Sequence, residues 1–255
     1  MLIKLDEQEF ERCLEFSRRC AQNQQQIEFG QADTKPRSTA EIGRDNLIGK
    51  MAEVAFAKML RERCGIEIDL DFNYYPRGKW DDQDAEINGW RIDIKATRKG
   101  GQWMLIEWSK LDFRQKQDKL SHLYVMASVD WDRVRDLPHR EVDLVGCASI
   151  KKLRPGISST KILRKGACIP NTKTCLQADN YAIHFSNLEN NWGYVLEYMM
   201  CNLPPDVTFY PNPYTGKPIA HDTAEHVCVS AKSRTSAKQN ESMLTWLKHL
   251  FGPKD

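Results

Sequence analysis

The 255-residue chain lacks an uninterrupted apolar run of the length that a membrane span requires. A transmembrane helix needs about 20 predominantly apolar residues, and the opening stretch MLIKLDEQEFERC carries too much charge for a secretory signal peptide. An excess of one charge is also missing, because 37 Lys and Arg are balanced by 35 Asp and Glu. Any surface that binds nucleic acid must therefore come from local clusters of cations. We expect a cytoplasmic protein with no membrane partner.

The eight cysteines include no C-x-x-C pair, which argues against a zinc ribbon and against a small disulfide scaffold. Reduced thiols are the default expectation. An alternative is a zinc or iron–sulfur site in the C-terminal half, built from Cys168, Cys175, Cys201 and Cys228 with His221 or His226. Their spacings fit none of the usual ligand patterns. A helix-turn-helix or zinc-finger motif that would read DNA bases is likewise not evident.

The stretch DAEINGWRIDIKAT, residues 84–97, contains the strongest local signal in the chain. Asn-Gly between two alternating runs is typical of a two-residue type I′ turn, because both central residues need positive φ. With Asn88 and Gly89 in the turn, the predicted pairs are 87–90, 86–91, 85–92, 84–93, 83–94 and 82–95. The polar face of this hairpin would carry Asp82, Asp84, Glu86, Arg91, Asp93 and Lys95. The apolar face would carry Ala85, Ile87, Trp90, Ile92 and Ile94.

This register places the carboxylates of Asp84 and Asp93 directly opposite each other. Opposed residues of an antiparallel pair have Cβ atoms about 4.5–5.5 Å apart, and like charges at that distance destabilise a sheet. A cation between the two carboxylates relieves the repulsion. The sequence therefore predicts a metal site on the hairpin. The alternative is a solvated network of ion pairs with Arg91 and Lys95 on a half-exposed face.

The remaining chain alternates helical and strand-like segments. A first amphipathic helix is predicted over 5–27, and a second runs through NLIGKMAEVAFAKMLRERCG to Gly65 behind a capping box of Ser38 and Glu41. On that helix Glu53 is the only acid at the edge of the apolar stripe. Strands are predicted over 65–72, 101–108, 123–129, 141–150 and 180–185, and further helices over 112–120, 186–200 and 242–251. Trp80, Trp90 and Trp103 are expected to pack in the core or at its rim.

A basic stretch follows residue 150. It contains seven Lys and Arg, and no acid occurs between Asp143 and Asp179. Because Lys and Arg supply most nonspecific affinity for DNA, six of these cations are candidate phosphate contacts: Lys151, Lys152, Arg154, Lys161, Arg164 and Lys165. A solvated loop face is the equally weighted alternative. The expected organisation is an N-terminal helix and connector over 1–36, a core over 37–150 and an extension over 151–255.

The order of helix, hairpin, strand, helix and strand resembles the PD-(D/E)XK nuclease superfamily, also called restriction-endonuclease-like. The matching residues are Glu53 in GKMAEVAF, Asp84 in DAEI, and Asp93 and Lys95 in DIKAT. The resemblance covers about residues 46–150. It departs from the family pattern at Gln83, where a proline is nominal, and Asp82 competes with Asp84 as the acidic residue. Of the two acid-x-Lys tripeptides in the chain, only Asp93-Ile94-Lys95 lies in a strand context.

This resemblance implies an α/β fold with a mixed sheet and a restriction-endonuclease-like core, flanked by the N-terminal helix and the C-terminal extension. It also implies hydrolysis of DNA phosphodiester bonds with Mg²⁺ or Mn²⁺. Mg²⁺ usually takes one or two carboxylates together with water and substrate phosphate, so Asp84 and Asp93 would bind the metal and Glu53 would hold the metal or its water. Lys95 would orient the attacking water and stabilise charge on the phosphate.

Cleavage of foreign DNA, as in restriction, is the favoured setting. Junction resolution and repair stay open, as do a homodimer and a protein partner. A catalytically silent DNA-binding subunit on the same fold, or a metal-stabilised structural module, are the alternatives from other classes.

Overall fold

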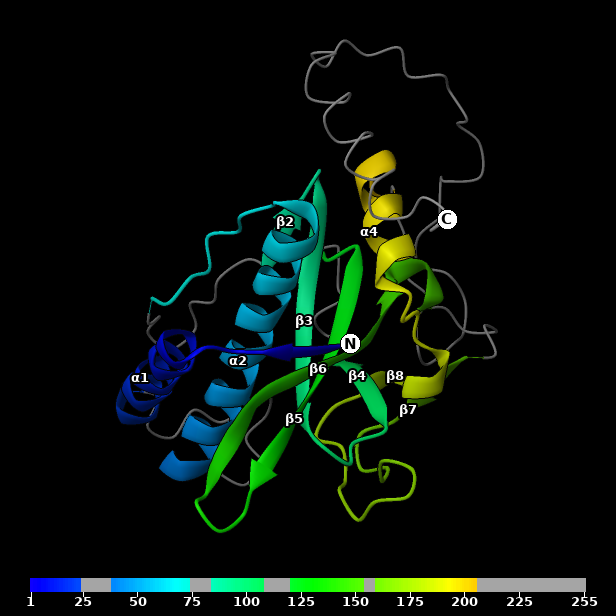
Figure 1. Cartoon of the computed structure of the whole chain (residues 1–255). Helices are drawn as coiled ribbons and strands as arrows, with labels where there is room; N and C mark the ends of the chain where they lie inside the picture. Colours follow the sequence, from blue (N-terminus) through cyan, green and yellow to red (C-terminus); the bar gives the residue numbers. More distant parts are fainter. Residues whose placement is uncertain (24–37, 74–83, 108–119, 154–158, 206–255) are drawn as a thin grey trace, which may run out of the picture. The chain divides into compact units, whose positions relative to one another are not determined.

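The computed structural model describes residues 1–23, 38–73, 84–107, 120–153 and 159–205. All of them lie in the first of two units into which the chain divides, Met1–Thr223, and the second unit, Ala224–Asp255, lies outside the described residues. Within the described part the protein is mixed α/β, with helices α1 (Glu7–Asn23), α2 (Thr39–Cys64) and α4 (Trp192–Cys201) and eight strands in two sheets (Figure 1).

The larger sheet has five strands in the order β1-β6-β5-β3-β2. Its members are β1 (Leu2–Lys4), β2 (Ala85–Ile87), β3 (Trp90–Arg98), β5 (Leu123–Asp132) and β6 (Leu137–Ser149). Strand β3 runs parallel to β5, and the other neighbouring pairs are antiparallel. The sheet is therefore mixed, and β2 is its edge strand beyond β3.

The smaller sheet joins segments that are far apart in the sequence. Strand β4 (Trp103–Glu107) pairs antiparallel with β8 (Asn180–His184), which pairs antiparallel with β7 (Thr160–Leu163). A strand near 101–108 is thus confirmed, but its hydrogen-bonded neighbour is β8 and not the hairpin. A restriction-endonuclease-like core remains an expectation from the resemblance, because the described topology establishes only the mixed α/β class.

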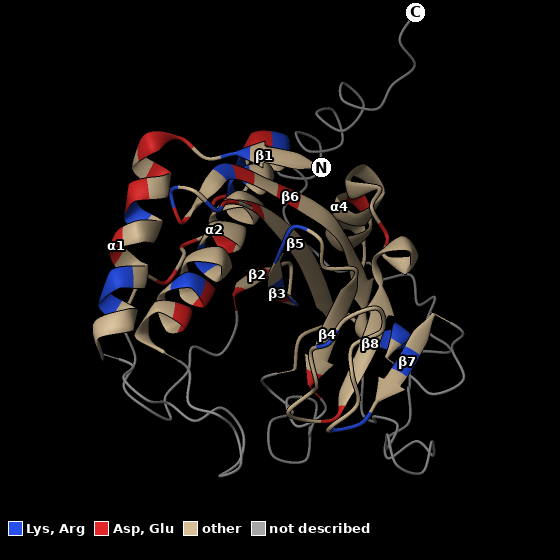
Figure 2. Ribbon diagram, turned by 90° about the horizontal axis from the view of Figure 1, so that it is seen from below, with Lys and Arg blue, Asp and Glu red and all other residues tan. Residues whose placement is uncertain are grey.

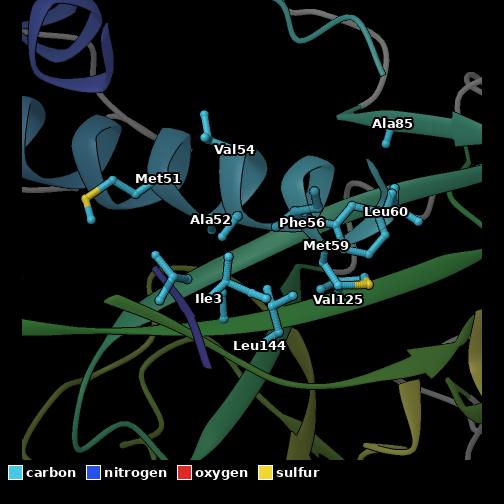
Figure 3. Close-up of a cluster of buried hydrophobic side chains, with 14 of the residues drawn as sticks. Ile3, Met51, Ala52, Val54, Phe56, Met59, Leu60, Ala85, Val125 and Leu144 are labelled. Carbon is cyan, nitrogen blue, oxygen red and sulfur yellow. The ribbon is translucent and has the colours of Figure 1, made fainter. Parts of the chain in front are cut away.

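Helix α2 forms where the sequence signals predict it. Ser38 accepts from the backbone N–H of Glu41 and the Glu41 side chain accepts from the backbone of Ser38, completing the capping box, while Gly65 ends the helix in the left-handed conformation at φ 64°. Figure 3 shows Ala52 and Phe56 of this helix facing Val125 and Leu144 of the sheet. The apolar stripe thereby covers one face of the larger sheet and forms the main core.

Helix α4 also belongs to that core. The ring of Trp192 lies 6.2 Å from that of Phe56, and its indole N–H donates to the carbonyl of Leu144 at 3.1 Å. The segment before the helix approaches Gly146 so closely that a Cβ at that position would lie 2.8 Å from the carbonyl oxygen of Glu189. Glycine is needed there because the two backbones are in contact.

Several predicted boundaries differ from the structure. Residues 65–73 form no strand, so the strand predicted over 65–72 is wrong; the carbonyl of Asp71 accepts instead from the Lys50 side chain at 2.7 Å. Strands β1 and β7 were not foreseen, because runs of three or four residues show too little alternation. The helix predicted over 186–200 begins only at Trp192, after a 3-10 turn at Phe185–Asn187. The helices predicted over 112–120 and 242–251 fall almost wholly outside the described residues.

Candidate active site

The β2–β3 hairpin has the predicted register. Ala85 pairs with Ile92, Glu86 with Arg91 and Ile87 with Trp90. Asn88 at φ 49° and Gly89 at φ 77° both adopt the left-handed conformation that a type I′ turn requires. The alternation of faces follows, so that Trp90, Ile92 and Ile94 are buried on the side of α2.

Asp84 lies in the bend immediately before β2. Its Oδ2 accepts the backbone N–H of Ile94 at 2.5 Å, which ties the start of the hairpin to the far strand. On β3, Lys95 Nζ lies 2.5 Å from Oδ2 and 2.7 Å from Oδ1 of Asp93. Both side chains are about one quarter exposed, at 22% for Lys95 and 24% for Asp93. The hairpin therefore brings Asp84, Asp93 and Lys95 together on its polar face.

Electrostatics place Glu53 with the same group. Burial, followed by the neighbouring charges of Asp93 and Glu53, raises the pKa of Asp84 to about 8. The N–H of Ile94 and the ammonium of Lys95 act in the opposite direction. Asp93, Glu53 and Lys95 are thus all close enough to Asp84 to act on its charge. Asp82, the competing acid, lies outside the described residues.

Lys50 is a member of the site that the sequence reasoning missed. It is only 4% exposed, and its ammonium forms an ion pair with Glu53 one helical turn away. The same ammonium lies 4.7 Å from the ring centroid of Phe16 and 5.2 Å from that of Phe72. A lysine between the buried residues Ile48 and Met51 was the available signal, because a charged residue inside an apolar stripe requires a partner.

A hollow of about 590 Å³ lies beside this ion pair. Its walls come from α1, which supplies Arg12, Glu15, Phe16 and Arg19, and from residues 69–73. The guanidinium of Arg12 stacks 3.8 Å from the ring centroid of Phe72. Residues 69–73, most of which fall in the strand predicted over 65–72, are therefore one wall of a pocket whose rings Phe16 and Phe72 lie close to the Lys50 ammonium.

A divalent metal fits the donor chemistry of the site but is not enclosed by it. Within the described ranges, no three His, Cys, Asp or Glu side chains are arranged so that they could hold a metal ion. Each carboxylate instead contacts a cation or a backbone N–H of the chain. Asp84 and Asp93 nevertheless offer the hard oxygens and the carboxylate number that Mg²⁺ prefers. The charges of Asp93 and Glu53 both act on Asp84, and a divalent cation would relieve that repulsion.

Strand β5 lies next to β3, which carries Asp93 and Lys95. Tyr124 is in register with Asp93 and Met126 with Lys95, and both side chains are buried. At the start of β5, His122 Nδ1 accepts the backbone N–H of Arg91 at 3.0 Å. Burial and the charge of Arg91 lower the pKa of His122 to about 4. His122 is therefore neutral at physiological pH and serves as a hydrogen-bond acceptor.

The basic residues begin at the same end of the sheet. Lys151 and Lys152 lie in the 3-10 turn Ile150–Lys152, whose first N–H donates to the carbonyl of His122 at 3.0 Å. Because strands are about 4.8 Å apart, this turn lies roughly two strand spacings, ~10 Å, from β3. Lys161 lies on β7, with its ammonium 5.0 Å from the ring centroid of Trp103, and Figure 2 shows blue for Lys and Arg on the ribbon of that strand.

The other predicted positions have separate outcomes. Arg164 and Lys165 follow β7 directly, and Arg154 lies outside the described residues. Trp90 is buried and Trp103 is half-buried, as expected for packing residues, while Trp80 lies outside.

The alternative metal site of the C-terminal half is brought together only in part. Cys168 and Cys175 are adjacent, with their Sγ atoms 3.3 Å apart. Cys201 is exposed on α4. Among the described residues, no His, Cys, Asp or Glu lies with Cys168 and Cys175 so that the three could hold a metal ion. Cys228, His221 and His226 lie outside the described residues.

Comparison of the chain with models of protein families, with curated proteins and with solved structures found no match. None of the described helices is long and apolar enough to cross a membrane.

Proposed function

We propose that the protein is a divalent-metal-dependent nuclease that hydrolyses DNA phosphodiester bonds, with defence against foreign DNA as its setting. The observation that carries the proposal is the environment of Asp84. Burial, together with the charges of Asp93 and Glu53, raises the pKa of this carboxyl group to about 8, and Lys95 lies beside it. Three acids and a lysine gathered between α2 and the β2–β3 hairpin are poorly explained by stability, since like charges repel.

Asp84 and Asp93 would bind Mg²⁺ or Mn²⁺, and Glu53 would hold a metal-bound water. When bound, the metal polarises the phosphoryl oxygen and lowers the pKa of the attacking water. Lys95 would orient that water and neutralise charge on the phosphate. The water oxygen forms the new bond to phosphorus, one ester P–O bond breaks, and the leaving oxygen takes up a proton. The products are a phosphate monoester and a hydroxyl end.

The cations beyond β6 support DNA as the substrate. Lys151 and Lys152 lie ~10 Å from β3, a distance comparable with the width of a DNA groove. Lys161 on β7, and Arg164 and Lys165 directly after it, add further cations. Such contacts position a duplex without reading its sequence.

A nuclease assay with matched variants tests the proposal. Supercoiled, linear, branched and single-stranded DNA, and RNA, are incubated with the full-length protein and Mg²⁺ or Mn²⁺. Asp93→Asn and Lys95→Met should each reduce the cleavage rate by at least about 100-fold. Asp130→Asn and Lys99→Met are the controls, because Lys99 and Asp130 form a more exposed ion pair, at 2.8 Å, at the other end of β3 and β5. Equal rates in all four variants, or cleavage in EDTA, would exclude this assignment.

A catalytically silent DNA-binding subunit is the second candidate. It is favoured by the contact between Lys95 and both oxygens of Asp93, which occupies a proposed metal ligand. This candidate predicts salt-dependent DNA binding that Lys151→Ala and Lys161→Ala weaken, together with no cleavage of any substrate.

A further inference from the structure

The turn that carries Cys168 and Cys175 holds the two residues directly opposite each other. They form an antiparallel β-bridge. The neighbouring residues make the backbone hydrogen bonds: Leu176 N–H donates to Ala167 and Ile169 N–H to Thr174, both at 2.9 Å. The cysteines thus occupy a non-hydrogen-bonded position, where opposed Cα atoms are about 4.5 Å apart and side chains approach most closely. That spacing lies inside the range of about 4.4–6.8 Å found across disulfides.

The sulfur atoms are also close and accessible. Their separation of 3.3 Å is a contact distance, and both residues are exposed. Among the described cysteines this combination is unique to the pair. Cys13, Cys20 and Cys147 are buried, and burial raises the pKa of Cys13 and of Cys147 to about 12. Those thiols are inert, because the thiolate is the reactive form.

We propose that Cys168 and Cys175 are a thiol-modification site that forms a reversible intramolecular disulfide by exchange with low-molecular-weight disulfides such as oxidised glutathione. The thiolate of one cysteine attacks a glutathione sulfur, and one glutathione leaves as a thiol. The second cysteine then attacks the sulfur of its neighbour and releases the second glutathione. The two protein thiols lose two electrons and two protons, which reduce one glutathione disulfide to two thiols.

The fold favours the intramolecular disulfide between Cys168 and Cys175 over mixed disulfides with other thiols. The bridging hydrogen bonds have already brought the two chain segments together, so little additional conformational entropy is lost. The contact between the two thiols raises the pKa of Cys168, because one thiol donates to the other and two thiolates would repel each other. Exchange should therefore become faster as the pH rises above neutrality.

Peptide mapping of the full-length protein tests this site. The protein is equilibrated in glutathione buffers of increasing oxidised fraction, blocked with N-ethylmaleimide, and digested with trypsin without reduction. Trypsin cleaves after Lys173, between the two cysteines, so a disulfide leaves the two resulting peptides joined. We expect the joined peptides to replace both alkylated ones, with a loss of two titratable thiols, and to disappear when dithiothreitol is added before blocking.

Three variants separate this bond from other thiol chemistry. Cys168→Ser and Cys175→Ser should each abolish the joined peptides. Cys201→Ser should leave them unchanged, because it removes an exposed cysteine outside the pair. Full alkylation of both cysteines in excess oxidised glutathione, separate glutathione adducts on each, or a link to Cys201 would overturn the proposal.

Discussion

At the scale of single residues, each acid of the site has its own partner, which is either a lysine or a backbone N–H. Lys50 neutralises Glu53, Lys95 neutralises Asp93, and Asp84 relies on one backbone N–H. Asp84 is the least compensated of the three acids, which is why burial and repulsion raise its pKa to about 8. It is therefore the residue at which the electrostatics of the site can be measured most directly.

Replacing Asp84 by Asn should make the metal-free protein more stable at alkaline pH. The folded pKa of about 8 lies above the ordinary value of 3.8, so the folded state retains a proton that the unfolded state loses. The stabilising contribution is complete below pH 3.8 and is lost as the pH rises to about 8. We expect the wild-type free energy of unfolding to fall by a few kcal/mol, to order of magnitude, relative to Asp84→Asn across this window.

Urea denaturation in EDTA at pH 5, 6.5 and 8 provides the measurement. The difference between wild type and variant removes the opposing effect of His122, whose lowered pKa makes stability rise with pH up to about 6.5. Mg²⁺ should restore stability to the wild type at pH 8 and not to Asp84→Asn. If the free energy of unfolding changes with pH in the same way in both proteins, Asp84 does not have the raised pKa.

At the scale of elements, α2 has two independent tasks. Its apolar stripe packs on the sheet and its Lys50–Glu53 turn faces the candidate site, while the capping box at Ser38 secures its first turn. The cap and Glu53 are 15 positions apart, which corresponds to ~22 Å along a helix. The stability of the helix and the chemistry of the site can therefore be changed separately.

Ser38→Ala should destabilise the protein by about 1 kcal/mol, because the N–H of Glu41 loses its acceptor. Chemical denaturation measures the change, and Mg²⁺ affinity at 25 °C should be unaffected. Glu53→Gln should have the reverse effect, weakening Mg²⁺ binding while leaving the cap intact. A loss of Mg²⁺ affinity in Ser38→Ala would mean that the cap and the site are coupled.

At the scale of the whole described unit, the two halves of the sequence share one structure. Helix α4 packs on α2 and on the larger sheet, and β8 supplies the partner of β4. The elements that carry the candidate site are therefore stabilised by α4 and β8. A single substitution where α4 packs on α2 should lower the stability of the whole described unit.

Trp192→Ala should lower the free energy of unfolding by about 3–5 kcal/mol, since it removes a buried ring and leaves the carbonyl of Leu144 without its indole donor. Tyr194→Ala on the same helix is the control, because that side chain is 55% exposed and should change stability by less than about 0.5 kcal/mol. Thermal unfolding followed by circular dichroism compares the two. Similar melting temperatures for both variants would contradict the packing role of Trp192.

Local signals accounted for the elements that are stabilised locally. The Asn88-Gly89 turn, the Ser38–Glu41 capping box and the Gly65 stop depend on φ angles and hydrogen bonds between near neighbours, and each was predicted correctly. Residues 65–72 alternate like a strand, but none of the described strands pairs with them, and the carbonyl of Asp71 accepts from the Lys50 side chain instead. Alternation shows that a segment can pair, whereas pairing also requires an edge strand within reach.

The sequence by itself determined the hairpin register, and with it the proximity of Asp84, Asp93 and Lys95, because strand side chains alternate strictly and the turn allows only one alignment. Only the tertiary structure decided that the Lys50 ammonium lies against the rings of Phe16 and Phe72, and that β4 pairs with β8. These contacts depend on how separate segments pack. The free energy of that packing comes from buried surface and paired charges brought together from distant parts of the chain, which no local pattern of residues encodes.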